Sequence, residues 1–275
     1  MIRFDGRAVL ITGAGRGLGR AYAHAFAARG ATVVVHDAGV GRRGERGDPT
    51  VADAVVAEIR AAGGRALPAY EDLSSADACV ALVERAAAEL GRLDVVVNNA
   101  GLVIYEELAE AERSWELMRR VQIDAPFHVS RTAFRLMQGQ RYGRFVFTTS
   151  GIAMSAEDTR PGLAAYCAGK MAQFGLMVVL AEEGRPHGIL SNAISPVAAT
   201  RVYTRPAAPG ELEPEQVAPG VLFLASEGCP VSGVVLAAAG GRFDVRHWAR
   251  SGGVDFGRDP VEPEEIAARW AEIAG

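Results

Sequence analysis

The chain has 275 residues, of which 49% are hydrophobic, and its 29 basic and 33 acidic side chains leave a formal net charge of −4. This composition is typical of a globular protein, and the slight acidity argues against an electrostatic grip on nucleic acid or on an anionic membrane. The chain contains no run of about 18 apolar residues, so we expect no transmembrane helix.

The cysteines and the first residues point to a reducing compartment. Cys79, Cys167 and Cys229 lie far apart and match neither a zinc spacing nor a disulfide framework. None of the five histidines stands in a ligand-spaced pair, so we expect no metal site. The N-terminus runs directly into a short apolar strand and lacks the layout of a signal peptide. We therefore expect a cytoplasmic protein.

Short apolar runs alternate with helical stretches along the chain. We expect strands at residues 7–12, 31–35, 65–70, 93–97, 144–149, 188–194 and 234–238, and helices at 18–29, 51–62, 76–90, 114–138 and 164–184. Because the apolar runs scarcely alternate with polar residues, they indicate parallel strands that are covered on both faces. Right-handed crossovers then give an α/β fold, a Rossmann-like doubly wound parallel sheet with helices on both faces.

No linker divides residues 1–251, which we expect to form a single dinucleotide-binding domain. The stretch from Pro206 to Pro219 is rich in proline and glycine and is interpreted as a loop over the site. Residues 252–275 are more charged, and Glu262-Pro263-Glu264-Glu265 is typical of a helix start. We expect this tail to be a short extension packed on the domain.

A glycine-rich loop, Thr12-Gly13-Ala14-Gly15-Arg16-Gly17-Leu18-Gly19, follows the first predicted strand and opens a helix. This is the context that a dinucleotide-binding turn requires. Glycines let the backbone approach a pyrophosphate, and the helix N-terminus supplies free N–H groups and a positive dipole. The alternative is a plain turn that closes a βα unit. The candidate cofactor-binding residues here are Gly13, Gly15, Arg16, Gly17, Leu18 and Gly19.

Asp37 follows the second predicted strand and is a candidate for choosing the cofactor. A carboxylate at this place accepts both ribose hydroxyls of NAD and repels the extra phosphate of NADP. An ordinary turn residue is the alternative. Arg16, Arg42 and Arg43 keep NADP open, because a guanidinium binds that phosphate well. We favour NAD.

Tyr166 and Lys170 stand four residues apart on a predicted helix, and this spacing places them on one face. An ammonium beside a phenol lowers the phenol's pKa and prepares it to transfer a proton. Ser150 ends the preceding predicted strand, at the edge of the sheet where sites gather, and it can donate a hydrogen bond to a substrate oxygen. Alone, the Tyr–Lys pair is no more than a common surface pair.

Asn98-Asn99-Ala100-Gly101 closes another predicted strand at that same edge. Polar amides there can brace a cofactor pocket, although a tight turn is the alternative. Four strand ends therefore converge on one crevice, which makes coincidence a poor explanation for the motifs.

Taken jointly and in order, these motifs resemble the short-chain dehydrogenase/reductase superfamily over nearly the whole chain. The resemblance implies hydride transfer between a nicotinamide and a carbinol or carbonyl carbon, with Tyr166 as general acid/base. It also implies that Lys170 holds the nicotinamide ribose and that Ser150 polarises the substrate oxygen. The further cofactor contacts that it implies are Asp72 and Leu73 on the adenine side, Asn99, Ala100 and Gly101 in the pocket, and Pro196, Val197 and Thr200 near the nicotinamide amide.

Several stretches are similar to the (3R)-hydroxyacyl-CoA dehydrogenase unit of the multifunctional enzyme of peroxisomal β-oxidation. They are Phe4-Asp5-Gly6-Arg7, His36-Asp37-Ala38-Gly39, residues 192–198, Val217-Ala218-Pro219 and the tail from Gly240. The similarity implies a 3-hydroxyacyl thioester as substrate. Bacterial relatives of this unit occur as free-standing dehydrogenases, so the similarity does not place the chain in a peroxisome.

Three features depart from the superfamily pattern. Gln122 stands where the superfamily usually has the Asn that anchors a proton-relay water, so we expect a relay that is shifted by the longer side chain. The interval from Ser150 to Tyr166 is 16 residues and carries a charged insertion at residues 156–161. The segment 200–214 is short for a lid over a CoA thioester. These departures favour an altered substrate over an altered reaction.

Two other functions stay open. One is a tailoring ketoreductase for a polyketide, steroid or other bulky cyclic ketone, which the insertion and the short lid favour. The other is a sensor that binds NAD(H) without turnover, which only Gln122 supports. Arg42, Arg43 and Arg46 can bind a CoA phosphate, but a solvated cluster is the more common role. The resemblance further implies a homodimer or homotetramer formed through the helices at residues 114–138 and 164–184.

Overall fold

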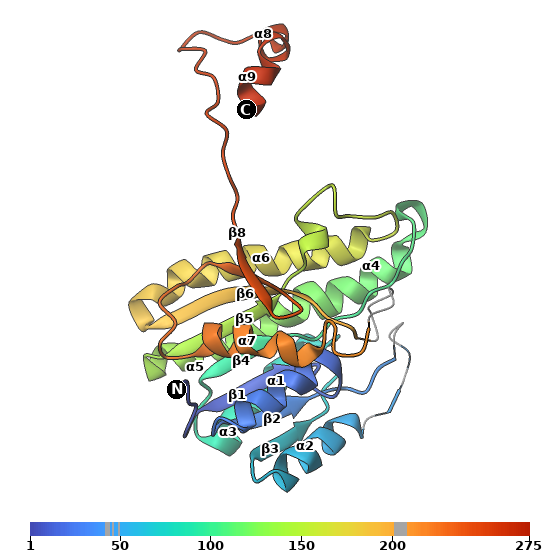
Figure 1. The fold of residues 1–275 in the computed structure, drawn as a ribbon, viewed down its shortest axis with the longest axis vertical. Helices are drawn as coiled ribbons and strands as arrows, with labels where there is room; N and C mark the ends of the chain where they lie inside the picture. Colours follow the sequence, from blue (N-terminus) through green and yellow to red (C-terminus); the bar gives the residue numbers. More distant parts are fainter. Residues whose placement is uncertain (42–44, 46, 49, 201–207) are drawn as a thin grey trace. The chain divides into compact units, whose positions relative to one another are not determined.

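An eight-stranded, mostly parallel sheet forms the centre of the computed structural model, which describes residues 1–41, 45, 47–48, 50–200 and 208–275 (Figure 1). The strand order is β3-β2-β1-β4-β5-β6-β7-β8. The order reverses between β1 and β4, which makes a crevice beyond the carboxyl ends of these strands. Ligands of open α/β sheets bind at such a switch point. The predicted doubly wound, Rossmann-like fold is confirmed.

The elements occur in the predicted order, with small shifts at their ends. The strands are β1 (Ala8–Thr12), β2 (Thr32–His36), β3 (Arg65–Ala69), β4 (Val95–Asn98), β5 (Gly143–Thr148), β6 (Ile189–Val197), β7 (Val235–Ala239) and β8 (Arg242–Arg246). The α-helices are α1 (Gly17–Ala27), α2 (Val51–Ala61), α3 (Ala76–Leu90), α4 (Glu112–Arg119), α5 (Ala125–Gln140), α6 (Ala164–Gly184), α7 (Ala218–Ala225), α8 (Pro263–Ala268) and α9 (Trp270–Ala274).

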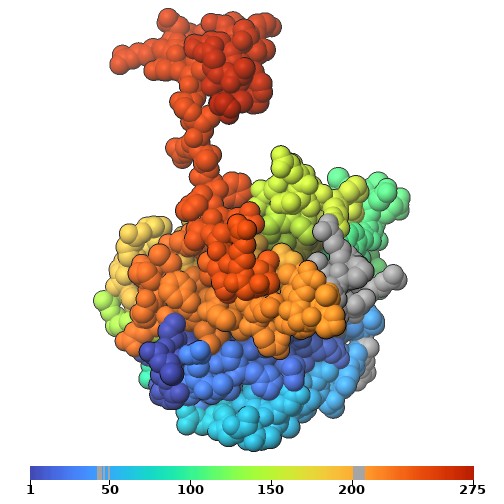
Figure 2. All heavy atoms as spheres, viewed as in Figure 1, coloured from blue at the N-terminus to red at the C-terminus, as the bar shows by residue number. Residues whose placement is uncertain are grey.

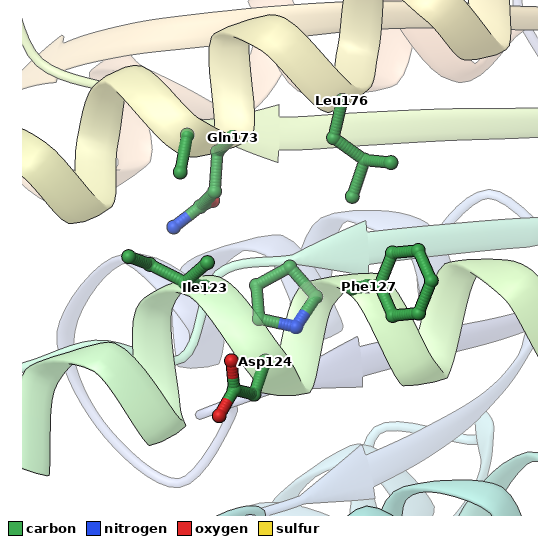
Figure 3. A pocket seen from close by; sticks show the side chains of 7 residues that line it. Ile123, Asp124, Phe127, Gln173 and Leu176 are labelled. Carbon is green, nitrogen blue, oxygen red and sulfur yellow. The ribbon is translucent and has the colours of Figure 1, made fainter. Parts of the chain in front are cut away.

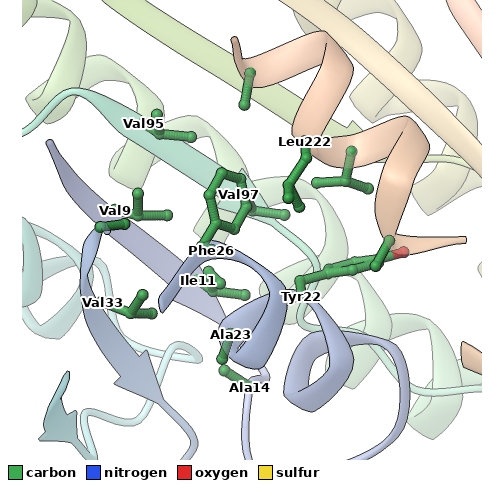
Figure 4. Close-up of a cluster of buried hydrophobic side chains, with 14 of the residues drawn as sticks. Val9, Ile11, Ala14, Tyr22, Ala23, Phe26, Val33, Val95, Val97 and Leu222 are labelled. Carbon is green, nitrogen blue, oxygen red and sulfur yellow. The ribbon is translucent and has the colours of Figure 1, made fainter. Parts of the chain in front are cut away.

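Two hydrophobic cores lie on opposite faces of the sheet, because side chains of successive strand residues point to opposite sides. On one face, Val9 and Ile11 pack with Tyr22 and Phe26 of α1 and Leu222 of α7 (Figure 4). In Figure 2, α1 (blue) lies between α2 (cyan) and α7 (orange) on this face. On the other face, residues of α3, α5 and α6 cover the sheet. Helices on both faces therefore fix the strand ends that carry the site.

Three elements differ from the prediction. The predicted helix at residues 114–138 is two helices, α4 and α5, joined by a π-helical segment at Arg120–Asp124. The α7 helix begins inside the stretch that was interpreted as a loop. It was not predicted because its residues are nearly all apolar and buried, so the sequence shows no helical period there. The β8 strand follows a turn at Gly240 and Gly241, both with positive φ.

The chain forms two compact units, residues 1–245 and 246–275. The second contains α8, which begins with a capping box between Glu262 and Glu265 as the sequence predicted. One segment of the described chain, Ala164–His187, is long and apolar enough to cross a membrane by length and composition. Core helices of soluble proteins pass the same test, and α6 within this segment packs on β5 and β6.

Candidate active site

The glycine loop leaves its backbone open at the start of α1. Arg16 precedes the helix without a side-chain cap bond, and the first turn carries no acidic residue. A Cβ on Gly19 would lie 2.2 Å from the carbonyl oxygen of Gly13, and one on Gly13 would lie 2.9 Å from the Cα of Ala100. Only glycine fits these positions, so the loop packs closely on the ends of β1 and β4 and forms a cradle at the start of α1. This cradle fits the pyrophosphate of a dinucleotide.

Thr12 and Asn99 hold the glycine loop against the end of β4. The Thr12 hydroxyl accepts hydrogen bonds from the backbone N–H of Asn99 (3.1 Å) and of Ala100 (3.0 Å). The Asn99 side-chain amide donates to the carbonyls of Thr12 (2.9 Å) and Gly13 (3.0 Å). This role of Thr12 was not predicted, although a hydroxyl at the last position of a buried strand is a signal for such a brace.

Asp37 lies beside the glycine loop, as expected from its place after β2. Its two carboxylate oxygens accept hydrogen bonds from the N–H of Gly15 (2.9 Å) and of Gly39 (2.8 Å). A Cβ on Gly15 would lie 2.8 Å from the Asp37 carboxylate. The carboxylate therefore stands at the rim of the cradle, where the ribose next to the pyrophosphate would lie.

The other residues predicted to bind the cofactor differ in how they are placed: one reaches the glycine loop, some are exposed, and one is buried in the core. The Thr200 methyl carbon lies 3.2 Å from the Cβ position of Gly17, so the segment after β6 reaches the glycine loop. Pro196 and Val197 end β6, and Val197 is exposed. Asp72 is exposed and accepts from the N–H of Ser74, whereas the Leu73 side chain is buried in the core. Arg42, Arg43 and Arg46 lie outside the described residues.

Lys170 is the only lysine in the chain, against 28 arginines. Its side chain is 5% exposed on α6, and its ammonium donates to the backbone carbonyl of Thr148 at 2.8 Å. Burial lowers the pKa of Lys170 to about 8. The 28 arginines cannot release a proton in a protein, whereas Lys170 can exchange its proton near neutral pH.

Tyr166 lies next to Lys170, and the Lys170 ammonium is 5.8 Å from the centre of its ring. Contrary to the lowering expected from the neighbouring ammonium, burial raises the pKa of the Tyr166 phenol, and a hydrogen bond with Ser150 partly opposes this rise. Ser150 follows β5 and is 8% exposed. The structure therefore brings together the serine, tyrosine and lysine that the sequence singled out.

Gln122 lies in the π-helical segment and is fully buried. Its side-chain amide donates to the carbonyl of Leu102 at 3.2 Å, while its Oε1 has no hydrogen-bond partner among the described residues. Glycines make room for the long side chain: a Cβ on Gly169 would lie 2.8 Å from the Cβ of Gln122, and one on Gly101 would lie 3.2 Å from its Oε1. The same point beside Gly101 is 3.4 Å from the Lys170 Nζ.

Sequence reasoning missed one further residue at this site. Gln173, one turn after Lys170, is buried and donates to the backbone carbonyl of Gln122 at 3.2 Å. The signal that was available is a polar side chain on the buried face of a helix, three residues after the lysine. Together, the strand ends supply a dinucleotide cradle, a proton donor and a tunable cation, which suits hydride transfer coupled to proton transfer.

Comparison with known proteins agrees with this geometry. A family model described as short chain dehydrogenase matches residues 7–207. The chain is 40% identical to peroxisomal multifunctional enzyme type 2 of Mus musculus over 99% of this chain, and it spans 37% of that protein's length. A short chain dehydrogenase from Mycobacterium avium superposes with a TM-score of 0.86 at 36% identity, covering 98% of this chain and 95% of that chain.

A second solved structure contains a bound nicotinamide cofactor. It is a metagenomic short-chain oxidoreductase in complex with NADP, with a TM-score of 0.70 and 30% identity to this chain. The match covers 83% of this chain and 95% of that chain.

Proposed function

The chain belongs to the short-chain dehydrogenase/reductase family and is an oxidoreductase acting on CH–OH groups, and we propose that it is an NAD(H)-dependent enzyme that interconverts a secondary alcohol and a ketone. The observation that carries the proposal is the placement of the chain's only lysine, buried beside Tyr166 at the edge of the sheet where the glycine loop lies. A bound nicotinamide supplies or accepts the hydride.

The side chains of the site then divide the proton chemistry. Ser150 donates a hydrogen bond to the substrate oxygen and orients the reacting carbon. Tyr166 gives its phenolic proton to that oxygen during reduction and takes it back during oxidation. Lys170 holds the nicotinamide ribose, and its positive charge favours the tyrosinate that forms when the proton leaves. Gln122 accepts a hydrogen bond from a water that lies beside Lys170.

The preference for NAD rests on Asp37. Its carboxylate faces the cradle through the N–H groups of Gly15 and Gly39, which keeps a negative charge at the adenosine ribose. This charge accepts the two ribose hydroxyls of NAD and repels the additional phosphate of NADP. Arg16 is the residue through which the alternative, NADP, would be held.

A 3-hydroxyacyl thioester is the substrate that we favour, because 99% of this chain matches part of the mouse multifunctional enzyme. A bulky cyclic ketone is the second candidate, and the insertion at residues 156–161 supports it. The insertion is mostly exposed, and the nearby Gly162 carbonyl accepts a hydrogen bond (3.0 Å) from the N–H of Glu106. The adjacent Tyr105 is 51% exposed, so an aromatic side chain is available at this rim.

We also propose that two copies of the chain associate through α5 and α6, as a homodimer or within a homotetramer, in the cytoplasm. Both helices expose large apolar side chains, namely Phe127, Leu136, Val178 and Val179. A groove of about 190 Å³ lies between the helices (Figure 3), and its lining residues are Ile123, Asp124, Pro126, Phe127, Ala172, Gln173 and Leu176. Phe127→Glu together with Val179→Glu should shift the chain toward the monomer in analytical ultracentrifugation.

The experiment that tests the function follows the absorbance of NADH and, in parallel, of NADPH with acetoacetyl-CoA and a panel of bulky cyclic ketones. Faster NADH oxidation with the thioester is the expected result. Turnover with the cyclic ketones alone would replace the thioester by the second substrate class. Tight NADH binding without turnover on any of these compounds would favour the non-catalytic sensor instead.

A further inference from the structure

Two buried glutamines face each other behind the Tyr166–Lys170 pair. Gln122 lies on the π-helical segment and Gln173 on α6, and their side chains are 0% and 1% exposed. Neither amide Oε1 has a hydrogen-bond partner within the part of the chain that the structure describes. A buried polar atom without a partner destabilises a protein, because it has lost its hydrogen bonds to water. Two such atoms, one on the residue a turn after the only lysine and one near its ammonium, therefore indicate a use in the site rather than in packing.

The Gln122 Oε1 and the Lys170 Nζ face the same small region. Both atoms lie within 3.4 Å of the point that a Cβ on Gly101 would occupy. An ammonium has three donors, and the carbonyl of Thr148 takes one of them. A water held between these two atoms can accept from Lys170 and donate to Gln122, which satisfies a donor of the cation and the buried oxygen together.

Gln173 determines where that oxygen stands. Its amide donates to the backbone carbonyl of Gln122, so it fastens the π-helical segment to α6 one turn beyond Lys170. Figure 3 shows the Gln173 side chain extending from α6 toward the segment that carries Ile123 and Asp124. With the backbone carbonyl of Gln122 engaged in this way, the side-chain oxygen is the acceptor that Gln122 presents to Lys170.

We propose that Gln173 is a positioning residue for Lys170: it fixes Gln122 so that the Gln122 side-chain oxygen binds a water that solvates the Lys170 ammonium. The inference rests on the proposed catalytic role of Tyr166 and Lys170. During reduction Tyr166 gives its proton to the substrate oxygen, and Lys170 then supplies a proton that restores the phenol. The water replaces the proton that Lys170 has lost and takes a new one from solvent. One proton is thus taken up for each carbonyl that a bound NADH reduces by hydride transfer.

The only lysine of the chain makes the proposal testable without a substrate. Lysine labelled with carbon-13 at Cε gives a single resonance from the full chain, and its pH titration reports the pKa of Lys170. Gln173→Met and Gln122→Met keep the side-chain length but remove the amide. Each should lower the pKa of Lys170 by about one unit, because the ammonium loses a solvating acceptor. The double variant should show little further shift, since both residues act through one water.

Gln140→Met is the matched control. Gln140 also braces a backbone, accepting from the N–H of Leu93 (3.0 Å) and donating to its carbonyl (2.8 Å), but it belongs to the opposite end of the sheet. This variant should lower the melting temperature without moving the Lys170 titration. A parallel crystal structure of the wild type should show an ordered water beside the Gln122 Oε1.

Two results would overturn the proposal. One is an unchanged Lys170 titration in both Gln122→Met and Gln173→Met, and the other is an equal shift in Gln140→Met. Should Gln173→Met fail to fold, Gln173→Leu, which also removes the amide, takes its place, and Gln122→Met gives the shift expected when the water is lost. Failure of the proposed function is separate, since it would appear as full turnover by Tyr166→Phe whatever the lysine titration shows.

Discussion

The two ends of the sheet differ in how many hydrogen-bond partners their buried charged side chains have. At the amino-terminal end, Asp94 is fully buried and accepts hydrogen bonds from Arg7 (3.0 Å), from Arg92 (2.6 and 2.7 Å) and from the N–H of Ala8 (2.9 Å). At the carboxyl end, Lys170 is nearly as buried, yet the one hydrogen bond of its ammonium to a described residue goes to the Thr148 carbonyl.

This difference indicates that the Asp94 end serves stability and the Lys170 end serves function. The Asp94 carboxylate is paired on both oxygens, and the ring of Tyr142 lies beneath the guanidinium groups of Arg7 (3.9 Å) and Arg144 (4.3 Å). At the Lys170 end, by contrast, the side-chain oxygens of Gln122 and Gln173 have no hydrogen-bond partner among the described residues. Proteins tolerate such locally unfavourable groups where a ligand or a reaction needs them. Substitutions at the two ends should therefore have opposite consequences.

The largest effect is expected for Tyr166→Phe. The substitution removes the proton donor but leaves the ring in its packed position, so kcat should fall by about 10²–10⁴-fold. The affinity for NADH, measured by fluorescence titration, and the midpoint of urea unfolding should stay near the wild-type values. Activity close to that of the wild type would exclude Tyr166 as the general acid/base.

Asp94→Ala should have the reverse phenotype. It leaves Arg7 and Arg92 without the buried carboxylate that they share, which should lower the free energy of unfolding by about 3 kcal/mol. Urea denaturation checks this value, with Arg3→Ala, an exposed partner of Asp5, as a control near zero. The kcat of the folded fraction should be unchanged, and a specific loss of kcat would break the proposed division between the two ends.

Lys170→Met should stabilise the protein while it abolishes turnover. Because burial lowers the pKa of Lys170 from 10.5 to about 8, the unfolded chain binds a proton between these values that the folded chain has released. Stability of the wild type therefore rises with pH across this window. The variant should gain about 3 kcal/mol below pH 8, and the gain should vanish as the pH approaches 10.5. A pH-independent difference in urea midpoints would mean that Lys170 is not buried as a cation.

Asp37→Ala should have the smallest effect. Loss of the carboxylate removes both the acceptor for the ribose hydroxyls of NAD and the repulsion of the NADP phosphate. The ratio of kcat/KM for NADH over NADPH should then fall by about tenfold, equivalent to about 1.4 kcal/mol. Asp72→Ala, at an exposed carboxylate that caps a turn, is the comparison variant. An unchanged ratio in Asp37→Ala would remove Asp37 from cofactor selection.

The sequence predicted the features that depend on local signals. Buried strands separated by helices gave the fold, and the glycine loop, Asp37, Tyr166 and Lys170 were found because each follows a strand or shares a helix face. The partnership of Gln122 with Gln173 could not be predicted, because it depends on a π-helical segment that shifts the register between α4 and α5. The Asp94 network was missed for a related reason, since it joins Arg7 to a residue 87 positions away.

The titration of Lys170 by carbon-13 resonance, with and without NAD, tests the central claim most directly. We expect a single lysine resonance with a pKa of about 8 that shifts when NAD is added, because the cofactor ribose then lies against the ammonium. A pKa near the ordinary value of 10.5 that ignores NAD would contradict it, since the only lysine would then be solvated and away from the cofactor.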